Sequence, residues 1–160
     1  MRIASDPIRD LTYTRMVKHE IRGLRLGENW TSAAGALEGI LTYLGQPLPR
    51  HALMGLTGHA WHTCLATRGQ VSVLPSGPAD LDWRAMVERY ARTGYRWERF
   101  GLELPADSPW DDLRSAAVEW GISHLDAGRP LLGWDFHLHE HGIVAGYDRT
   151  RGGFLVEDIL

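Results

Sequence analysis

The chain contains, at residues 30–45, the sequence WTSAAGALEGILTYLG, which has the pattern of one buried helix. Its apolar side chains recur at helical spacing, at Leu37, Ile40, Leu41 and Leu44. Thr31 and Ser32 are both suited to cap the free N–H groups of a first turn. Gly45 suits the left-handed residue that ends a helix, and Pro47 prevents continuation. We therefore expect one helix with hydroxyl residues at its start.

Two glycines, Gly35 and Gly39, lie four residues apart within this helix. Each is expected to lower helix stability by roughly 1 kcal/mol relative to alanine. A glycine pair on one face is useful where another backbone, or a second catalytic element, must approach closely. The sequence therefore predicts that this helix lies against another part of the chain.

Composition places the protein among ordinary globular domains. The 160 residues fit one domain, residues 1–160, with 44% hydrophobic and 23% charged residues. The net charge of -3 gives no basic surface for nucleic acid or for an acidic membrane. The seven Trp residues are expected in the core or in the walls of a cleft.

The N-terminus and the cysteine content bear on location. There is one cysteine, Cys64, so an internal disulfide is excluded and a reducing compartment is favoured. No long apolar run opens the chain, so neither a signal peptide nor a membrane anchor is expected. We predict a cytoplasmic protein. Because a complete sheet usually continues beyond the last expected strand, the chain is expected to be truncated at its C-terminus or to be a compact variant.

Local patterns predict helices in the first two thirds of the chain and a mostly antiparallel sheet at its end, which is the α+β class. Besides 30–45, helices are expected at 51–56, 82–94 and 108–128, the last with Ser108 as N-cap and Pro109 at the first helical position. Strands are expected at 11–17, 59–65, 71–74, 95–100, 130–134, 139–147 and 153–158. Residues 22–28 are expected to form a loop.

Ser32, His141 and Asp158 form the first candidate site. The start of a helix favours a developing negative charge at Ser32. His141 opens one expected strand and Asp158 ends the next, 17 residues later, so a hairpin would bring them to the same end. A carboxylate that orients an imidazole beside a nucleophile is the arrangement of a catalytic triad.

The order of these motifs resembles the papain-like bacteriocin-processing peptidases, and more closely the N-terminal domain of the butirosin-biosynthesis acyltransferase. In these proteins a Cys opens a helix that ends in Tyr-Leu-Gly or Tyr-Tyr-Gly about a dozen residues later, and Tyr43-Leu44-Gly45 places Ser32 at that Cys position. The later motifs are matched by Gly128-Arg129-Pro130, by His141 to Asp148, and by Leu155 to Asp158. Residues 55–60 also resemble a segment of the acyltransferase relatives. The resemblance covers about residues 26–160.

The resemblance implies a papain-like α+β fold, with an N-terminal helical part packed on a C-terminal antiparallel sheet and a cleft between them. It implies a hydrolase or acyltransferase that acts on a peptide, amide or thioester, with no cofactor. Ser32 would be the nucleophile, His141 the base, and Asp158 the residue that orients His141. The Gln that supplies the family's oxyanion donor is missing. Asn29 is the nearest substitute, since Glu28 would be a poor donor, and its amide would hold the oxyanion together with the Ser32 N–H.

The chain departs from this family at its nucleophile, because a Ser hydroxyl requires an adjacent base whereas a Cys thiol is partly ionised at neutral pH. Three interpretations follow: a natural serine variant that transfers acyl groups, an inactive homologue that binds a peptide or small molecule in the same cleft, or an engineered replacement of Cys by Ser. At Ser32 itself, a plain helix cap is the simpler structural alternative.

A second candidate site is the alternating series His137, His139 and His141. Three imidazoles on one face of a strand suit Zn²⁺ or another divalent metal, with His59 or His62 as a further ligand. Side chains that only line a cleft are the alternative. His59 is also expected to enter the cleft from the side or to lie on the surface, and Cys64 is a second-choice nucleophile that fits better as a buried apolar residue.

Overall fold

The computed structural model describes residues 17–61, 82–100, 109–136 and 139–159 and has the expected α+β class. The described helices are α1 (Ser32–Tyr43), α2 (Arg50–Thr57), α3 (Trp83–Tyr90) and α4 (Trp110–Asp126), with short 3-10 turns η1 (His59–Trp61) and η3 (Ala91–Thr93). The described strands are β1 (Lys18–Glu20), β2 (Leu131–Trp134), β3 (His141–Asp148) and β4 (Gly153–Glu157).

The four described strands form one antiparallel sheet in which β3 makes every pairing. β4 pairs along one edge of β3, whereas β2 and β1 share the other edge, β2 beside residues 141–144 and β1 beside residues 146–148. All eight residues of β3 are buried. Gly146 lets β1 approach, because a Cβ there would lie 2.2 Å from the His19 carbonyl oxygen.

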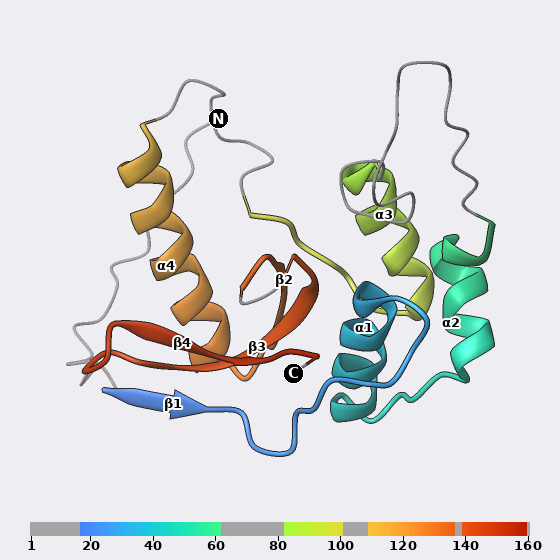
Figure 1. Cartoon of the computed structure of the whole chain (residues 1–160), viewed down its shortest axis with the longest axis horizontal. Coiled ribbons are helices and arrows are strands. Elements are labelled where there is room, and N and C mark those ends of the chain that lie inside the picture. The colour runs from blue at the N-terminus through green and yellow to red at the C-terminus, as the bar shows by residue number, and fades with distance from the viewer. Residues whose placement is uncertain (1–16, 62–81, 101–108, 137–138, 160) are drawn as a thin grey trace, which may run out of the picture.

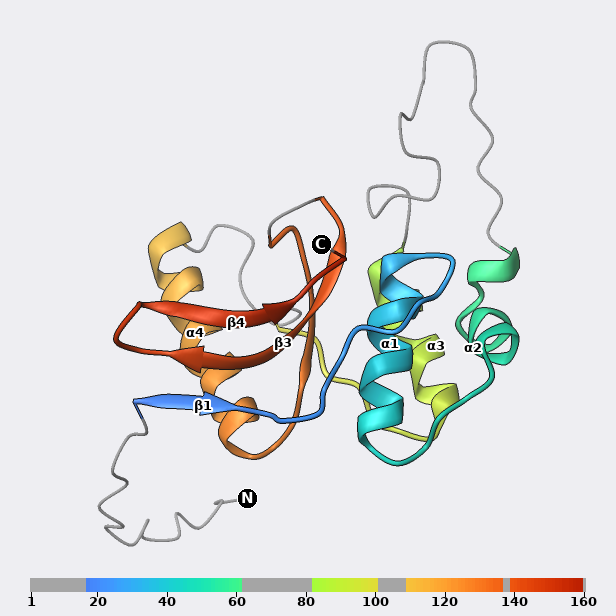
Figure 2. The same cartoon turned by 60° about the horizontal axis from the view of Figure 1, so that its bottom comes forward.

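Helix α1 lies between the sheet and the other helices of the N-terminal half, while α4 packs on the sheet from another side (Figure 1, Figure 2). One face of α1 places Ala36 and Ile40 in a core with residues of β3 and α4. The neighbouring face places Leu37 and Leu41 in a second core with residues of α2 and α3. A helix buried on two faces is apolar around most of its circumference.

The third face of α1 receives the loop that precedes it. A Cβ on Gly35 would lie 2.4 Å from the Gly27 carbonyl oxygen, and one on Gly39 would lie 1.9 Å from the Arg25 carbonyl oxygen. The Gly27 N–H donates to the Gly35 carbonyl at 2.9 Å. The predicted close approach is therefore confirmed, and the approaching element is the backbone of this loop.

The helix ends follow the expected chemistry. Gly45, Gly58, Gly94 and Gly128 all adopt a positive φ at or just after a helical segment. Asp82 caps α3 by accepting from the N–H groups of Arg84 and Ala85. For α4, Pro109 lies at the cap position rather than at the first helical position, and Ser108 lies outside the described residues.

Two of the expected strands are wrong where the structure describes them. Residues 95–100 alternate but form no strand. Residues 59–61 form η1 instead of starting a strand, and the rest of that expected strand, at 62–65, lies outside the described residues, as do 11–16 and 71–74. β3 starts at His141 rather than at residue 139. The strand at Leu131–Trp134, the hairpin turn and β4 are confirmed, although β4 ends at Glu157.

Candidate functional site

Ser32 is the first residue of α1, but Thr31 is its cap. The Thr31 hydroxyl accepts from the Ala34 N–H at 3.2 Å, and its backbone is extended as a cap residue requires. Ser32 is therefore not needed to cap the helix. Its hydroxyl instead points to the start of β3.

Three polar groups of Glu140 and His141 surround the Ser32 hydroxyl. Ser32 Oγ donates to Glu140 Oε2 at 2.5 Å and lies 3.4 Å from His141 Nδ1. It also accepts from the His141 backbone N–H at 3.1 Å. The predicted meeting of Ser32 and His141 is thus present, with Glu140 as an additional partner.

His141 is a buried imidazole at the first position of β3. Its exposed fraction is 4%, and its ring lies 4.9 Å, centroid to centroid, from that of Trp134 on β2. Burial, and secondarily the charge of His59, lower the pKa of His141 to about 4. The ring is therefore neutral at pH 7, the state in which an imidazole accepts a proton.

His59 reaches the same region from η1. Its Nδ1 lies 2.8 Å from the Thr57 hydroxyl, which itself lies 2.8 Å from the Leu53 carbonyl oxygen. Because the hydroxyl has one proton and the carbonyl can only accept, Thr57 accepts from His59 Nδ1–H. The charge of His59 contributes to the lowered pKa of His141, so His59 lies near the site, as expected if it enters the cleft from the side.

Asp158 lies at the expected end of the hairpin but does not orient His141 by a hydrogen bond. Its Oδ1 accepts from the Ile159 N–H at 2.7 Å, and its Oδ2 is buried with no hydrogen-bond partner among the described residues. The pairing of Ile143 with Glu157, continued by one residue, sets Asp158 opposite Gly142. Since side chains of successive strand residues alternate between faces, this register does not align Asp158 with His141.

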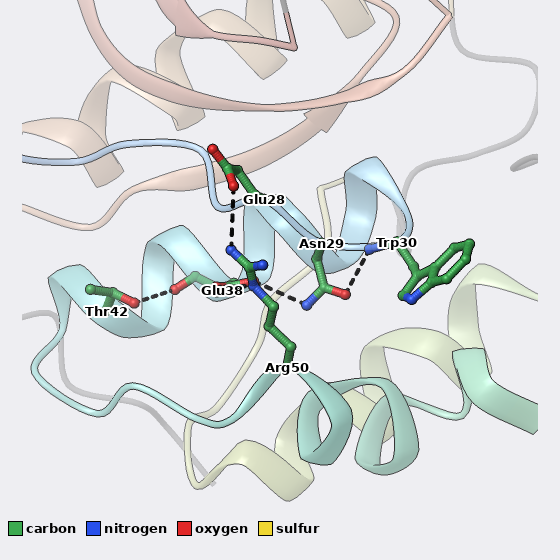
Figure 3. A network of polar contacts seen from close by, with 6 residues as sticks. All are labelled: Glu28, Asn29, Trp30, Glu38, Thr42 and Arg50. Carbon is green, nitrogen blue, oxygen red and sulfur yellow. Dashed lines mark hydrogen bonds and ion pairs between the residues drawn. The ribbon is translucent and has the colours of Figure 1, made fainter.

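The Asn29 amide is held by the scaffold before Ser32. Its Nδ2 donates to Glu38 Oε2 at 3.0 Å, and its Oδ1 accepts from the Trp30 N–H at 2.8 Å (Figure 3). Glu38 also accepts from Arg50 Nε at 3.2 Å. Asn29 thus fixes the loop to α1, and one of the two N–H donors of its amide is taken by Glu38.

The histidine series does not share one face in the described part of the chain. His139 precedes β3, is exposed, and bonds Asp135 Oδ1 through Nδ1 at 2.7 Å, whereas His141 is buried. Among the described residues no group of three or more His, Cys, Asp or Glu side chains could hold a metal ion. His137, His62 and Cys64 lie outside these residues.

Glu140 is the site residue that sequence reasoning missed. It lies between two histidines and its only local signal is its position directly before His141. Its contact with Ser32 joins residues 108 positions apart, which no local pattern reveals.

Comparison with protein-family models, with curated proteins and with solved structures found no match. In the described part of the chain, no helix combines the length and the apolar character needed to cross a bilayer.

Proposed function

We propose that the protein is a papain-like hydrolase or acyltransferase that acts on a peptide, amide or thioester through Ser32. The observation that carries the proposal is the position of Ser32 Oγ at the start of α1, 3.4 Å from Nδ1 of a buried, neutral His141. A nucleophilic hydroxyl requires such a base within reach, and this distance is loose, as is common before substrate binds.

The proposed reaction has two steps. Ser32 Oγ attacks the substrate carbonyl carbon while His141 Nδ1 takes the hydroxyl proton. The bond to the leaving amine or thiol then breaks, and the leaving group takes that proton from His141 Nδ1–H. Water, or an acceptor amine or alcohol, attacks the Ser32 ester in the same way and restores the hydroxyl.

The helix start supplies donors for the oxyanion. The first N–H groups of a helix have no partner within the helix, and Thr31 uses that of Ala34. The N–H groups of Ser32 and Ala33 remain, and the helix dipole favours negative charge there. The Ser32 N–H keeps the role suggested by the sequence, and we propose the Ala33 N–H as its partner in place of the Asn29 amide.

A binding protein without turnover is the second candidate, and a specific observation favours it. The Ser32 proton is directed to Glu140 at 2.5 Å rather than to His141, and Asp158 makes no hydrogen bond with a described side chain. In that case the same site would bind a peptide or small molecule, and binding would persist in Ser32→Ala.

Labelling with a fluorophosphonate probe distinguishes the two candidates. We expect covalent labelling at Ser32, mapped by mass spectrometry of the digested protein, and a loss of at least about 100-fold in rate for His141→Ala, within the usual range for removing a general base. The matched control is His139→Ala, which removes an exposed imidazole two residues away and should label like the wild type.

A folded wild-type protein that shows no adduct at Ser32 would argue against acyl chemistry and for the binding protein. An adduct formed at the same rate in His141→Ala would remove His141 from the role of base.

A further inference from the structure

We infer that the site takes acyl groups that carry an ammonium next to the reacting carbonyl, and that Glu140 is the residue that binds this ammonium. Amino-acyl esters and thioesters, and peptides with a free N-terminus next to the scissile bond, belong to this class. The inference rests on the proposed function for the fate of the substrate, but ammonium recognition is testable without turnover.

Glu140 is a carboxylate placed directly at the nucleophile. Its Oε2 accepts from Ser32 Oγ at 2.5 Å, and the side chain is partly buried. No arginine, lysine or histidine in the described part of the chain forms an ion pair with it. By contrast, the Glu157 carboxylate pairs with the Arg25 guanidinium at 3.1 Å.

A carboxylate that has no cationic partner among the described residues disfavours the negative charge that the proposed chemistry develops. The tetrahedral intermediate places a negative oxygen on the carbon bonded to Ser32 Oγ, and like charges a few ångströms apart repel strongly in a partly buried site. His141 becomes cationic when it takes the Ser32 proton, but burial, which lowers its pKa, disfavours that charge. A positive charge on the substrate would add to the compensation that the protonated His141 gives.

The geometry suits an amine on the α-carbon. In the intermediate, three bonds of about 1.5 Å each join Ser32 Oγ to that nitrogen, so the nitrogen lies within about 4 Å of Oγ. Glu140 Oε2 lies 2.5 Å from the same Oγ. An α-ammonium is therefore within reach of a charge-assisted hydrogen bond to Glu140.

Binding of the ammonium would also release the nucleophile. The Ser32 hydroxyl has a single proton, and at rest it donates this proton in a hydrogen bond to Glu140. When an ammonium occupies Glu140 Oε2, the hydroxyl can turn to His141 Nδ1, 3.4 Å away. The correct substrate thus moves Ser32 from its resting partner to its base.

The test compares binding of L-alaninamide and propionamide, which differ in the α-ammonium, to Ser32→Ala, a variant that cannot be acylated. NMR titration should give saturable binding of alaninamide, with propionamide at least tenfold weaker. Glu140→Gln in the same background should remove the difference. Glu157→Gln is the control, because it removes one negative charge from the adjacent strand but leaves Glu140 intact.

Equal affinity for the two amides, no saturable binding of alaninamide, or an unchanged preference in Glu140→Gln would each overturn the inference. These outcomes leave the proposed function to the fluorophosphonate experiment. In a turnover assay with alanyl and propionyl nitrophenyl esters, Glu140→Gln should lower kcat/KM for the alanyl ester selectively, by tenfold or more. An equal loss on both esters would mean that Glu140 acts as a base instead.

Discussion

At the scale of single residues, the site depends on one proton with two acceptors. The Ser32 hydroxyl can donate its hydrogen bond to the Glu140 carboxylate or to the His141 imidazole, and in the structure it donates to Glu140. A serine hydroxyl that donates to Glu140 has to turn before His141 can take its proton. We therefore propose that a substrate whose ammonium occupies Glu140 acylates Ser32 faster than one that leaves Glu140 unoccupied.

The buried His141 makes stability depend on pH. Its pKa is about 4 in the folded protein and about 6.5 when unfolded, so the unfolded chain binds more protons between these values. Stability should fall as pH falls from about 6.5 to about 4, by up to about 3 kcal/mol at about 1.4 kcal/mol per pKa unit. Urea unfolding at a series of pH values should show a smaller loss in His141→Gln than in the wild type.

The control for this dependence of stability on pH is His139→Gln, because the His139 side chain is 82% exposed. It should retain the wild-type dependence of the free energy of unfolding on pH. If His141→Gln and the wild type lose stability in parallel below pH 6.5, His141 does not remain neutral in the folded state.

At the scale of elements, α1 is fixed by two cores and by the loop on its glycine face. Gly39→Ala should lower the free energy of unfolding by about 1–3 kcal/mol or more, because its Cβ would meet the Arg25 carbonyl oxygen at 1.9 Å and force that backbone away. Thermal or urea unfolding followed by circular dichroism measures the change.

Gly55→Ala in α2 is the matched control, since a Cβ at Gly55 meets nothing within 4 Å. Helix propensity and the reduced entropy of the unfolded chain should make it stabilising by about 0.5–1 kcal/mol. A Gly39→Ala variant as stable as Gly55→Ala would show that the loop does not need to lie so close to α1.

The helices could be predicted from the sequence because the residues that start and end them act through local interactions. Thr31, Asp82 and Gly45 act through groups a few residues away, so the sequence alone reveals them. Strands depend on partners. Residues 95–100 alternate correctly but pair with no strand, whereas the polar Lys18–Glu20 forms β1 because β3 offers it an edge.

The candidate site could be predicted only where it depends on local patterns. Ser32 and His141 open a helix and a strand, and these positions are visible in local patterns. The role of Glu140, and the failure of Asp158 to reach His141, depend on side-chain orientation and on a bulge between Val144 and Gly146 in the pairing of β3 with β4. Neither can be derived from spacing.

At the scale of the whole molecule, the two cores meet at α1 and bring Ser32 to the first residue of β3. The Ser32–His141 contact joins residues 109 positions apart, so it exists only when the helical part and the sheet pack as described. A papain-like arrangement requires this contact to place a nucleophile against its base.

Substitution of Ser32 by Cys tests that geometry most directly. In a Cys64→Ser background, Ser32→Cys leaves one thiol, placed at the start of α1 and beside His141. We predict that a peptide chloromethyl ketone alkylates this thiol at least tenfold faster than it alkylates free cysteine, and that adding His141→Ala abolishes the advantage. Alkylation no faster than that of free cysteine, or indifferent to His141, would contradict the account.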